Sequence, residues 1–179
     1  KFSVEYPASF MLVTSMNPCP CGYYNHPSKE CVCAPGMVAK YLNKISGPLL
    51  DRIDIHLEVV PVPFKKLSEQ APTEPSSAIR QRVIRAREIQ SQRFHDSEGV
   101  FCNAQMSSKM IRQYVDLDET SNTLLKNAME RLGLSARAYD RILKVSRTIA
   151  DLEGSERVES HHLSEAIQYR SLDRENWGG

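Results

Sequence analysis

The chain lacks any hydrophobic run long enough to cross a bilayer, and it shows no secretory signal pattern. It also has little net charge, +1 at pH 7 over 179 residues. No overall field therefore attracts nucleic acid or an anionic membrane. Five cysteines, an odd number, together with the absence of a secretion signal, predict a reducing compartment. We expect a cytoplasmic protein without membrane contacts.

The phosphate-binding motifs of nucleotide hydrolases are also absent. No G-x-x-x-x-G-K-[ST] motif occurs, and no glycine is followed by lysine anywhere in the chain. An apolar strand followed by a pair of acids, which would hold magnesium, is missing as well. The acids between Tyr114 and Glu119 imitate such a pair, but their context is that of a helix cap. The chain by itself is therefore not expected to cradle a triphosphate.

What is present divides into two regions of different pattern. Residues 10–15 form a short apolar run, and residues 53–59 alternate strictly between apolar and polar, so both are predicted to be strands. Four prolines between Pro61 and Pro75 predict a linker over residues 63–77. The remainder has helical periodicity. The fold is thus expected to be mainly α, with a small α/β part ahead of an all-α bundle.

Helices are expected over six segments. Ser135 and Ser160 are predicted N-caps, and Gly133 is a predicted C-terminal stop. The helix after Ser135 has the best apolar stripe, which we expect to be buried: Ala138, Ile142, Val145, Ile149 and Leu152. The predicted ranges are 38–45, 78–94, about 107–115, 119–132, 135–152 and a last helix starting near 160.

Four cysteines lie in two tight pairs, Cys19-Pro-Cys21 and Cys31-Val-Cys33, inside a segment rich in proline and glycine, residues 18–36. Two thiol pairs brought together by a turn supply the four sulfur ligands of a structural zinc ion. The usual spacing is C-x2-C, so reduced free thiols and disulfides remain alternatives. Four sulfurs leave no open position, which argues against a catalytic ion. His26 is a possible replacement ligand.

Three polar residues are candidates for chemistry, each with a simpler reading. Asn17 ends the first predicted strand, where ligands of open α/β sheets bind, but asparagine also simply terminates strands. Arg52 either pairs locally with Asp51 or Asp54, or presents a cation to a transferring phosphoryl group on a neighbouring subunit. Arg137, in the first helical turn after Ser135, either belongs to a solvated basic face or meets phosphate at the helix N-terminus.

Several strings in the chain are specific, and together they resemble the magnesium-chelatase-like AAA+ ATPases of the ComM/YifB family. The resemblance extends over essentially the whole chain. It is carried by Thr14-Ser-Met-Asn17-Pro-Cys-Pro-Cys-Gly22, Cys31-Val-Cys33, Tyr41, the run from Ser46 to Asp54 (SGPLLDRID), and the run from Ser135 to Leu152 (SARAYDRILKVSRTIADL).

The resemblance implies roles for three residues. Asn17 corresponds to sensor 1, which positions the attacking water; Arg52 to the arginine finger acting on ATP of the adjacent subunit; and Arg137 to sensor 2 on the lid. It implies a remnant of an AAA+ core over residues 1–62 with the cysteine-rich insertion at 18–36, and a helical lid over 78–179. It further implies ATP and Mg²⁺ as cofactors, a homo-hexamer, and DNA as the partner of a branch-migrating helicase that acts in natural transformation.

The chain departs from the family pattern because the phosphate loop and the magnesium-binding acids are missing. With Lys1 in first position, we expect a C-terminal fragment that is inactive alone. Two other functions remain open. One is a zinc-stabilised nucleic-acid-binding module using the arginines between Arg80 and Arg93. The other is an ATPase motor of a magnesium-chelatase-type complex. The cysteine insertion favours the ComM/YifB group over the latter.

Overall fold

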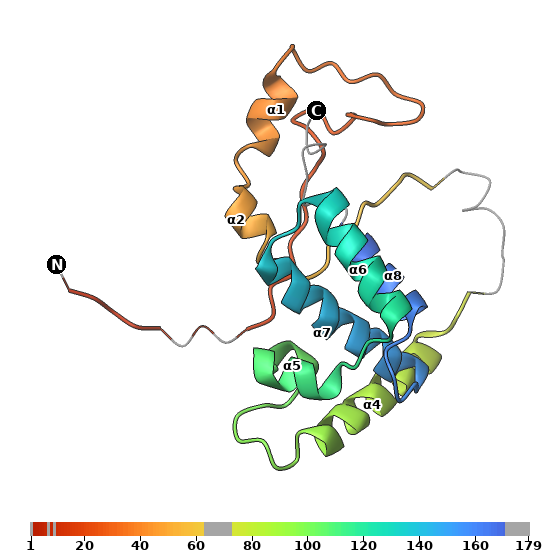
Figure 1. The fold of residues 1–179 in the computed structure, drawn as a ribbon. Helices are drawn as coiled ribbons and strands as arrows, with labels where there is room; N and C mark the ends of the chain where they lie inside the picture. Colours follow the sequence, from red (N-terminus) through yellow and green to blue (C-terminus); the bar gives the residue numbers. More distant parts are fainter. Residues whose placement is uncertain (1, 7, 9, 63–72, 171–179) are drawn as a thin grey trace.

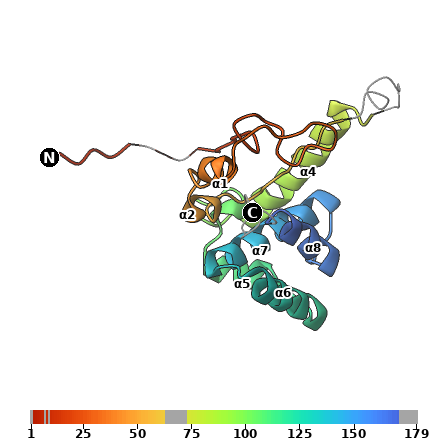
Figure 2. The same ribbon diagram turned by 90° about the horizontal axis from the view of Figure 1, so that it is seen from above.

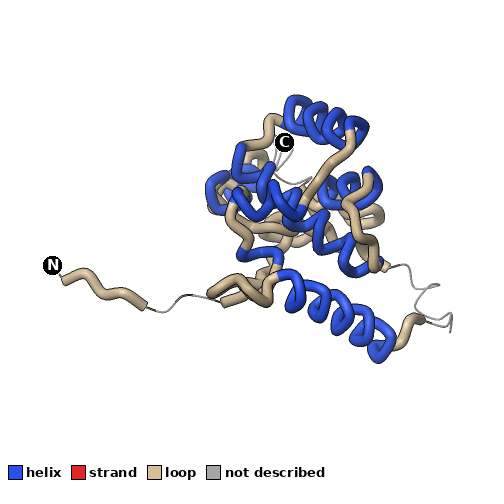
Figure 3. Tube along the Cα trace, turned by 60° about the horizontal axis from the view of Figure 1, so that its bottom comes forward, coloured by secondary structure: helices blue, strands red, loops and turns tan. Residues whose placement is uncertain are grey.

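Helices make up all the regular secondary structure in the described part of the computed structural model, residues 2–6, 8, 10–62 and 73–170 (Figure 3). Two short helices lie in the N-terminal third. The longer ones follow residue 75. In chain order the elements are α1 (Met37–Leu42), α2 (Gly47–Leu50), α4 (Ser76–Arg93), the 3-10 turn η1 (Asn103–Gln105), α5 (Ser108–Tyr114), α6 (Glu119–Leu132), α7 (Ala136–Glu153) and α8 (Ser160–Gln168).

Helix α7 lies at the centre of the bundle. It packs against α8, α4, α5 and η1, while α6 packs on α8. Figure 1 shows this arrangement from the side and Figure 2 from above; in Figure 1, α2 lies next to the N-terminal end of α7, and α1 and the cysteine-rich loop lie further from it. The predicted class, mainly α with a helical bundle at the C-terminal side, is confirmed.

The helix ends follow local chemistry. The Ser135 hydroxyl accepts a hydrogen bond from the Ala138 amide at 3.1 Å, which confirms the predicted cap of α7. Asp118 caps α6 in the same way, and Gly133 ends that helix with a φ of 49°. The predicted cap Ser160 is wrong by one residue. Glu159 is the N-cap of α8 and forms a reciprocal capping box with His162, so Ser160 is the first helical residue.

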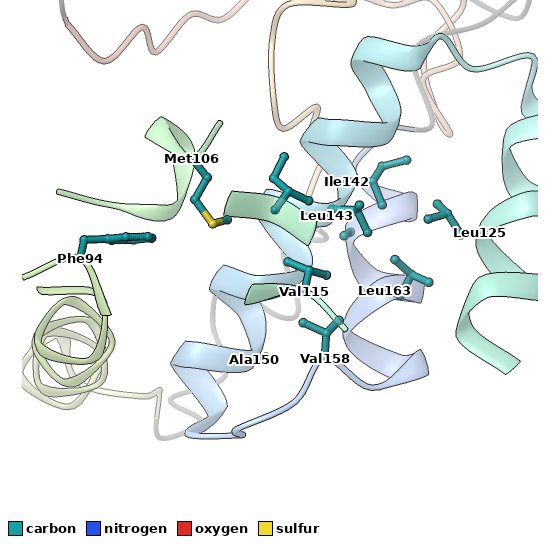
Figure 4. Packing of buried hydrophobic residues seen from close by; sticks show 11 residues of the cluster. Phe94, Met106, Val115, Leu125, Ile142, Leu143, Ala150, Val158 and Leu163 are labelled. Atoms are coloured by element: carbon teal, nitrogen blue, oxygen red, sulfur yellow. The ribbon is translucent and has the colours of Figure 1, made fainter. Parts of the chain in front are cut away.

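The hydrophobic core lies where α5, α6, α7 and α8 meet (Figure 4). Its side chains come from α5, α6, α7 and α8, from the residue that ends α4, and from the segments that connect the helices. The buried cluster comprises Phe94, Met106, Ile111, Val115, Leu125, Ile142, Leu143, Ala150, Val158, Leu163 and Ala166. Burial of such side chains contributes roughly 1.5–3 kcal/mol each, so this cluster is the main source of stability for the helical part.

The buried face of α7 differs from the predicted apolar stripe. Ala138 and Ile142 are fully buried as expected, but Leu152 at the end of the stripe is exposed. In its place, the polar Arg147 and Asp151 face the interior. At this end of the bundle the buried face of α7 is polar, because the Asp151 carboxylate lies between the guanidinium groups of Arg93 and Arg147.

The Asp151 carboxylate is the centre of this polar network. It accepts two hydrogen bonds from Arg93, at 2.7 and 2.5 Å, and one from Nε of Arg147 at 3.1 Å. Asn103 donates to it at 2.7 Å. Burial lowers the pKa of the Arg147 guanidinium, and Asp151 opposes that shift. The network ties α4, η1 and α7 together.

Neither predicted strand forms in the described residues. Residues 10–15 and 53–59 are extended but have no hydrogen-bonded neighbouring strand, and Met11 and Val59 are 87% and 91% exposed. A β-strand is defined by pairing, so an apolar pattern produces only extended chain where no partner lies alongside. The predicted linker falls largely outside the described residues, since its residues 63–72 are not described and α4 already begins at Ser76. No described helix combines the length and apolarity that a bilayer crossing requires.

Candidate functional site

The four paired cysteines converge on one point. The Sγ–Sγ separations are 3.3 Å for Cys19–Cys21, 3.8 Å for Cys19–Cys31 and 3.5 Å for Cys21–Cys31, and the sulfur of Cys33 lies within 4.8 Å of the others. None of the four is in a disulfide. Tetrahedral zinc with bonds of about 2.3 Å sets its sulfurs roughly 3.8 Å apart. The cluster therefore fits a single tetrahedral ion.

The loop backbone brings the thiols together. The Gly22 amide donates to the Cys19 carbonyl at 3.0 Å, and Gly22 has a φ of 81°, which closes a tight turn around the first pair. Cys19 is completely buried. His26 takes no part, because its Nδ1 accepts hydrogen bonds from the amides of Ser28 and Lys29. The cluster therefore offers four sulfur atoms and no nitrogen to a metal ion.

The thiols have opposed proton affinities. The backbone amide of Tyr23 lowers the pKa of Cys21 to about 6. For Cys33, the backbone amide of Cys21 lowers the pKa, but burial and the neighbouring sulfurs outweigh it and raise the value to about 12. Crowded sulfurs resist successive ionisation. A divalent cation at their centre removes that resistance.

A second cluster consists of Glu153, His161 and His162. Its geometry suits hydrogen bonds between the histidines and the carboxylate better than metal binding. The Nε2 atoms of both histidines face one oxygen of Glu153, with His161 at 2.9 Å. Nδ1 of His162 accepts the Glu159 amide, so its ring proton is on Nε2, where a metal would need a lone pair. The hydrogen bond from His161 lowers the pKa of Glu153, and Glu153 raises that of His161.

Arg52 lies in an exposed turn after α2. Its guanidinium donates to the carbonyl of Pro48 at 2.6 Å, four residues earlier in the same turn. The local ion pair considered for it does not form in the described structure, because Asp51 and Asp54 both have partners elsewhere. Arg141 of α7 pairs with Asp54. The cation of Arg52 is thus presented to solvent.

Asp51 instead faces the N-terminus of α7. Its carboxylate accepts a hydrogen bond from the Ser135 hydroxyl at 2.8 Å, and Nη1 of Arg137 is 4.0 Å away. A carboxylate at a helix N-terminus is favoured by the helix dipole. Arg137 remains 67% exposed. The basic face expected on this helix is only partly solvated, because Arg141 pairs with Asp54 and Lys144 donates to the Ala104 carbonyl at 2.9 Å.

The segment around Arg52, residues 50–56, is also held by the end of α8. Arg170 is 1% exposed and donates to the carbonyl of Ile53 and, at 3.4 Å, to that of Asp51. The His56 amide donates to the Tyr169 carbonyl at 2.9 Å. Arg170 was not a sequence candidate. A cation near the end of a helix normally indicates a surface residue, and no local pattern shows that it is buried.

Two of the three predicted chemical residues are therefore brought near each other. Residues 50–56 carry Arg52 and contact the helix turn that carries Arg137. Asn17 is exposed, precedes the cysteine cluster directly, and has no hydrogen-bonding partner among the described residues. Within this part of the chain, no contact connects Asn17 to either arginine.

Two family models match the sequence. The one described as magnesium chelatase, subunit ChlI C-terminal, matches residues 73–170, and the one described as magnesium chelatase, subunit ChlI, matches residues 1–67. The first covers the helical bundle. The second covers the cysteine cluster and the segment that carries Arg52.

Bacterial relatives match nearly the whole chain. YifB of Escherichia coli (strain K12) is 42% identical over 172 residues, 96% of this chain and 33% of that protein. Competence protein ComM of Haemophilus influenzae is 41% identical over 172 residues, 96% of this chain and 32% of that protein. A protein of Mycobacterium tuberculosis (strain H37Rv) is 36% identical over 165 residues, 92% of this chain and 32% of that protein. The chain spans about a third of the length of these relatives.

Proposed function

This chain belongs to the magnesium-chelatase-like family of AAA+ proteins that includes ComM and YifB, and from that premise we propose that it supplies the C-terminal part of an ATPase site shared between subunits of a ring. Residues 1–62 form the end of the ATPase core, and residues 78–179 form its lid. The phosphate loop and the magnesium ligands belong to other parts of a longer protein. No residue of this chain is assigned to the magnesium ion.

The observation that carries the proposal is the placement of two arginines. Arg52 is exposed and forms no ion pair among the described residues, because Asp51 and Asp54 pair with other arginines. Arg137 lies in the first turn of α7 and is also exposed. A phosphate group at the start of α7 would meet free amide groups, the helix dipole and a guanidinium together. The Asp51 carboxylate already accepts a hydrogen bond from Ser135 there, so the start of α7 holds an anionic group, which a phosphate would have to displace.

Each residue then has one role. Arg137 contacts the nucleotide of its own subunit from the lid. Arg52 reaches the nucleotide of the adjacent subunit and stabilises the charge that develops on the transferred phosphoryl group. Asn17 orients the attacking water. Asn17 and Arg52 are both exposed, and neither forms an ion pair among the described residues. This agrees with residues that meet their partners only in the assembled ring, which we propose is a homo-hexamer.

We propose that DNA is the substrate on which the ATP-driven ring acts. One relative is a competence protein by name, and the family resemblance implies a helicase that promotes branch migration in natural transformation. ATP hydrolysis would then drive remodelling of joined DNA strands, in the cytoplasm.

A subunit-mixing experiment tests the shared site. In the longer protein, subunits without a phosphate loop and subunits carrying Arg52→Ala should each be nearly inactive as ATPases. Mixing them should restore activity, because a ring then contains some interfaces with one intact phosphate loop and one intact Arg52. Activity is measured as phosphate release over a range of mixing ratios. If mixing restores nothing while mixed rings form by mass, the site is not shared in this way.

For the four cysteines we propose a structural zinc ion. The support is the separation of the sulfurs and their reduced state, which together match a closed four-sulfur site. Zinc bound there would supply rigidity and no chemistry of its own. Cys19, Cys21, Cys31 and Cys33 would hold it, and residues 18–36 would be fixed directly after Asn17.

Elemental analysis of purified chain should give about one zinc per chain, falling to near zero in the variant Cys21→Ser. Cys102→Ser is the matched control. That thiol lies in a different loop, against Gln105, so zinc content should stay unchanged. Chelation should speed amide exchange in residues 18–36 and leave the helices from α4 onward protected. Equal zinc in the wild type and in Cys21→Ser would contradict the assignment.

One observation favours a second function, binding of nucleic acid without ATP. Most residues in the first two thirds of α4 are exposed, and Arg80, Arg85 and Arg87 are among them. Phosphate contacts by such arginines would give a steep salt dependence. Salt-dependent binding of the 179-residue chain to duplex DNA, with unaltered ATPase in an Arg80/Arg85/Arg87→Ala variant of the longer protein, would favour this function.

A further inference from the structure

Arg170 is an unusual residue for its position, because it follows the last helix and yet is almost completely buried. Its guanidinium reaches back to residues 50–56, the segment that carries Arg52. It donates to the carbonyl oxygens of Ile53 and Asp51, and Nη2 lies 3.6 Å from the Asp51 carboxylate. A buried guanidinium is stable only while acceptors surround it.

The two carbonyls that Arg170 contacts lie on either side of Arg52. Asp51 precedes Arg52 and Ile53 follows it, so the backbone of Arg52 is held from both sides. The Arg52 side chain itself is not engaged by Arg170 and points away to Pro48 and solvent. Arg170 therefore fixes the backbone position of Arg52 and leaves the Arg52 guanidinium available for other partners.

Further contacts hold the same segment on the lid. Ser135 at the start of α7 donates to the Asp51 carboxylate, Arg141 of α7 pairs with Asp54, and the His56 amide bonds to Tyr169 at the end of α8. These partners come from the two helices that pack most extensively together in the bundle. Residues 50–56 are thus attached to the lid itself.

We propose that Arg170 is a positioning residue for Arg52, and that it couples the lid of one subunit to the nucleotide bound by the next. This inference rests on the proposed function. Arg137 on the lid responds to the subunit's own nucleotide. Because Arg170 and Ser135 hold the Arg52 segment on the same lid, a lid movement carries Arg52 toward or away from the neighbouring site. A misplacement of about 1 Å at a catalytic group lowers rates about a hundredfold.

A purely structural role for Arg170 makes a different prediction, so two measurements separate the roles. The first is amide hydrogen exchange on the 179-residue chain. In Arg170→Ala, amides of residues 50–56 should exchange at least about tenfold faster, while those of α6 and the centre of α7 stay protected. Loss of protection throughout the bundle would mean that Arg170 only supports the fold, and would overturn the proposal.

The second measurement is a double-mutant cycle on ATP turnover in the longer protein. Arg170→Ala should lower kcat about a hundredfold with KM little changed. Combined with Arg52→Ala it should cause no further loss, because a misplaced and an absent side chain are equivalent. Arg170→Lys keeps the positive charge but lacks the planar set of guanidinium N–H donors, so it should recover part of kcat. Arg112→Ala, an exposed arginine of α5, is the control and should retain full turnover.

The outcomes distinguish a failure of the proposed function from a failure of the positioning role of Arg170. If Arg52→Ala leaves turnover normal, the proposed function itself is wrong. If Arg52→Ala abolishes turnover but Arg170→Ala leaves kcat normal, only the positioning role is wrong. The positioning role is also wrong if Arg170→Ala lowers kcat and the double variant loses the product of the two single losses. Residues that act independently combine in that way.

Discussion

Replacing Arg52 with alanine in the longer protein is expected to slow ATP turnover about a thousandfold or more. The reason is electrostatic. The transferred phosphoryl group spreads negative charge over its oxygens in the transition state, and a guanidinium brought in by a neighbouring subunit stabilises that charge in a site shielded from water. Arg52 is free for this task, since among the described residues its side chain has one hydrogen bond, to the Pro48 carbonyl of α2.

The expected loss is mainly in kcat, because the interaction strengthens in the transition state. Steady-state phosphate release across a range of ATP concentrations separates kcat from KM. Arg87→Ala is the matched control, since Arg87 is an exposed arginine on α4 outside the proposed site. If Arg52→Ala and Arg87→Ala had equal turnover, Arg52 would have no role in catalysis.

Replacing Asp151 with alanine is expected to destabilise the helical bundle by about 3–5 kcal/mol. The Asp151 side chain has no solvent exposure, and it is the shared partner of Arg93 and Arg147. Its removal would leave two buried guanidinium groups next to each other without the negative charge between them. Domains of this size have a total stability of about 5–15 kcal/mol, so a large part of it would be lost.

Urea denaturation followed by far-ultraviolet circular dichroism measures this effect. Glu130→Ala provides the control, because Glu130 is an exposed acid on α6, and its change should stay within about 0.5 kcal/mol. Asp151→Asn keeps the volume and one acceptor oxygen but replaces the other with a donating NH2 group, so its loss should be intermediate. A change of under about 1 kcal/mol for Asp151→Ala would show that the network does not stabilise the bundle.

Local chemistry made parts of the fold predictable. Helix α6 begins and ends where its sequence indicates, because Asp118 caps it and Gly133 ends it with a left-handed conformation. The cysteine cluster was predictable for a similar reason. Only nine residues separate the two thiol pairs, so a single turn of the chain is enough to bring the four sulfurs together. Interactions that span a few residues leave a readable signal in the sequence.

Long-range pairing was not predictable. The extended residues 10–15 and 53–59 have strand patterns but no neighbouring strand in the described structure, and a pattern does not reveal whether a partner is present. Arg147 and Asp151 are polar, so helical periodicity assigns them to the surface, although a third residue, Arg93 of α4, makes their burial favourable. The contacts of Asp51 with Ser135 and Arg170 join residues far apart in sequence.

The contact between Arg170 and Ile53 spans 117 residues of chain. Closing so long a loop costs entropy that local helix contacts do not, and chains dominated by such contacts fold more slowly. During synthesis, Arg52 would leave the ribosome well before Arg170 exists, so its turn would lack this contact until the residues that follow α8 have been made. A chain interrupted before residue 170 would therefore lack the side chain that holds the carbonyl groups on either side of Arg52.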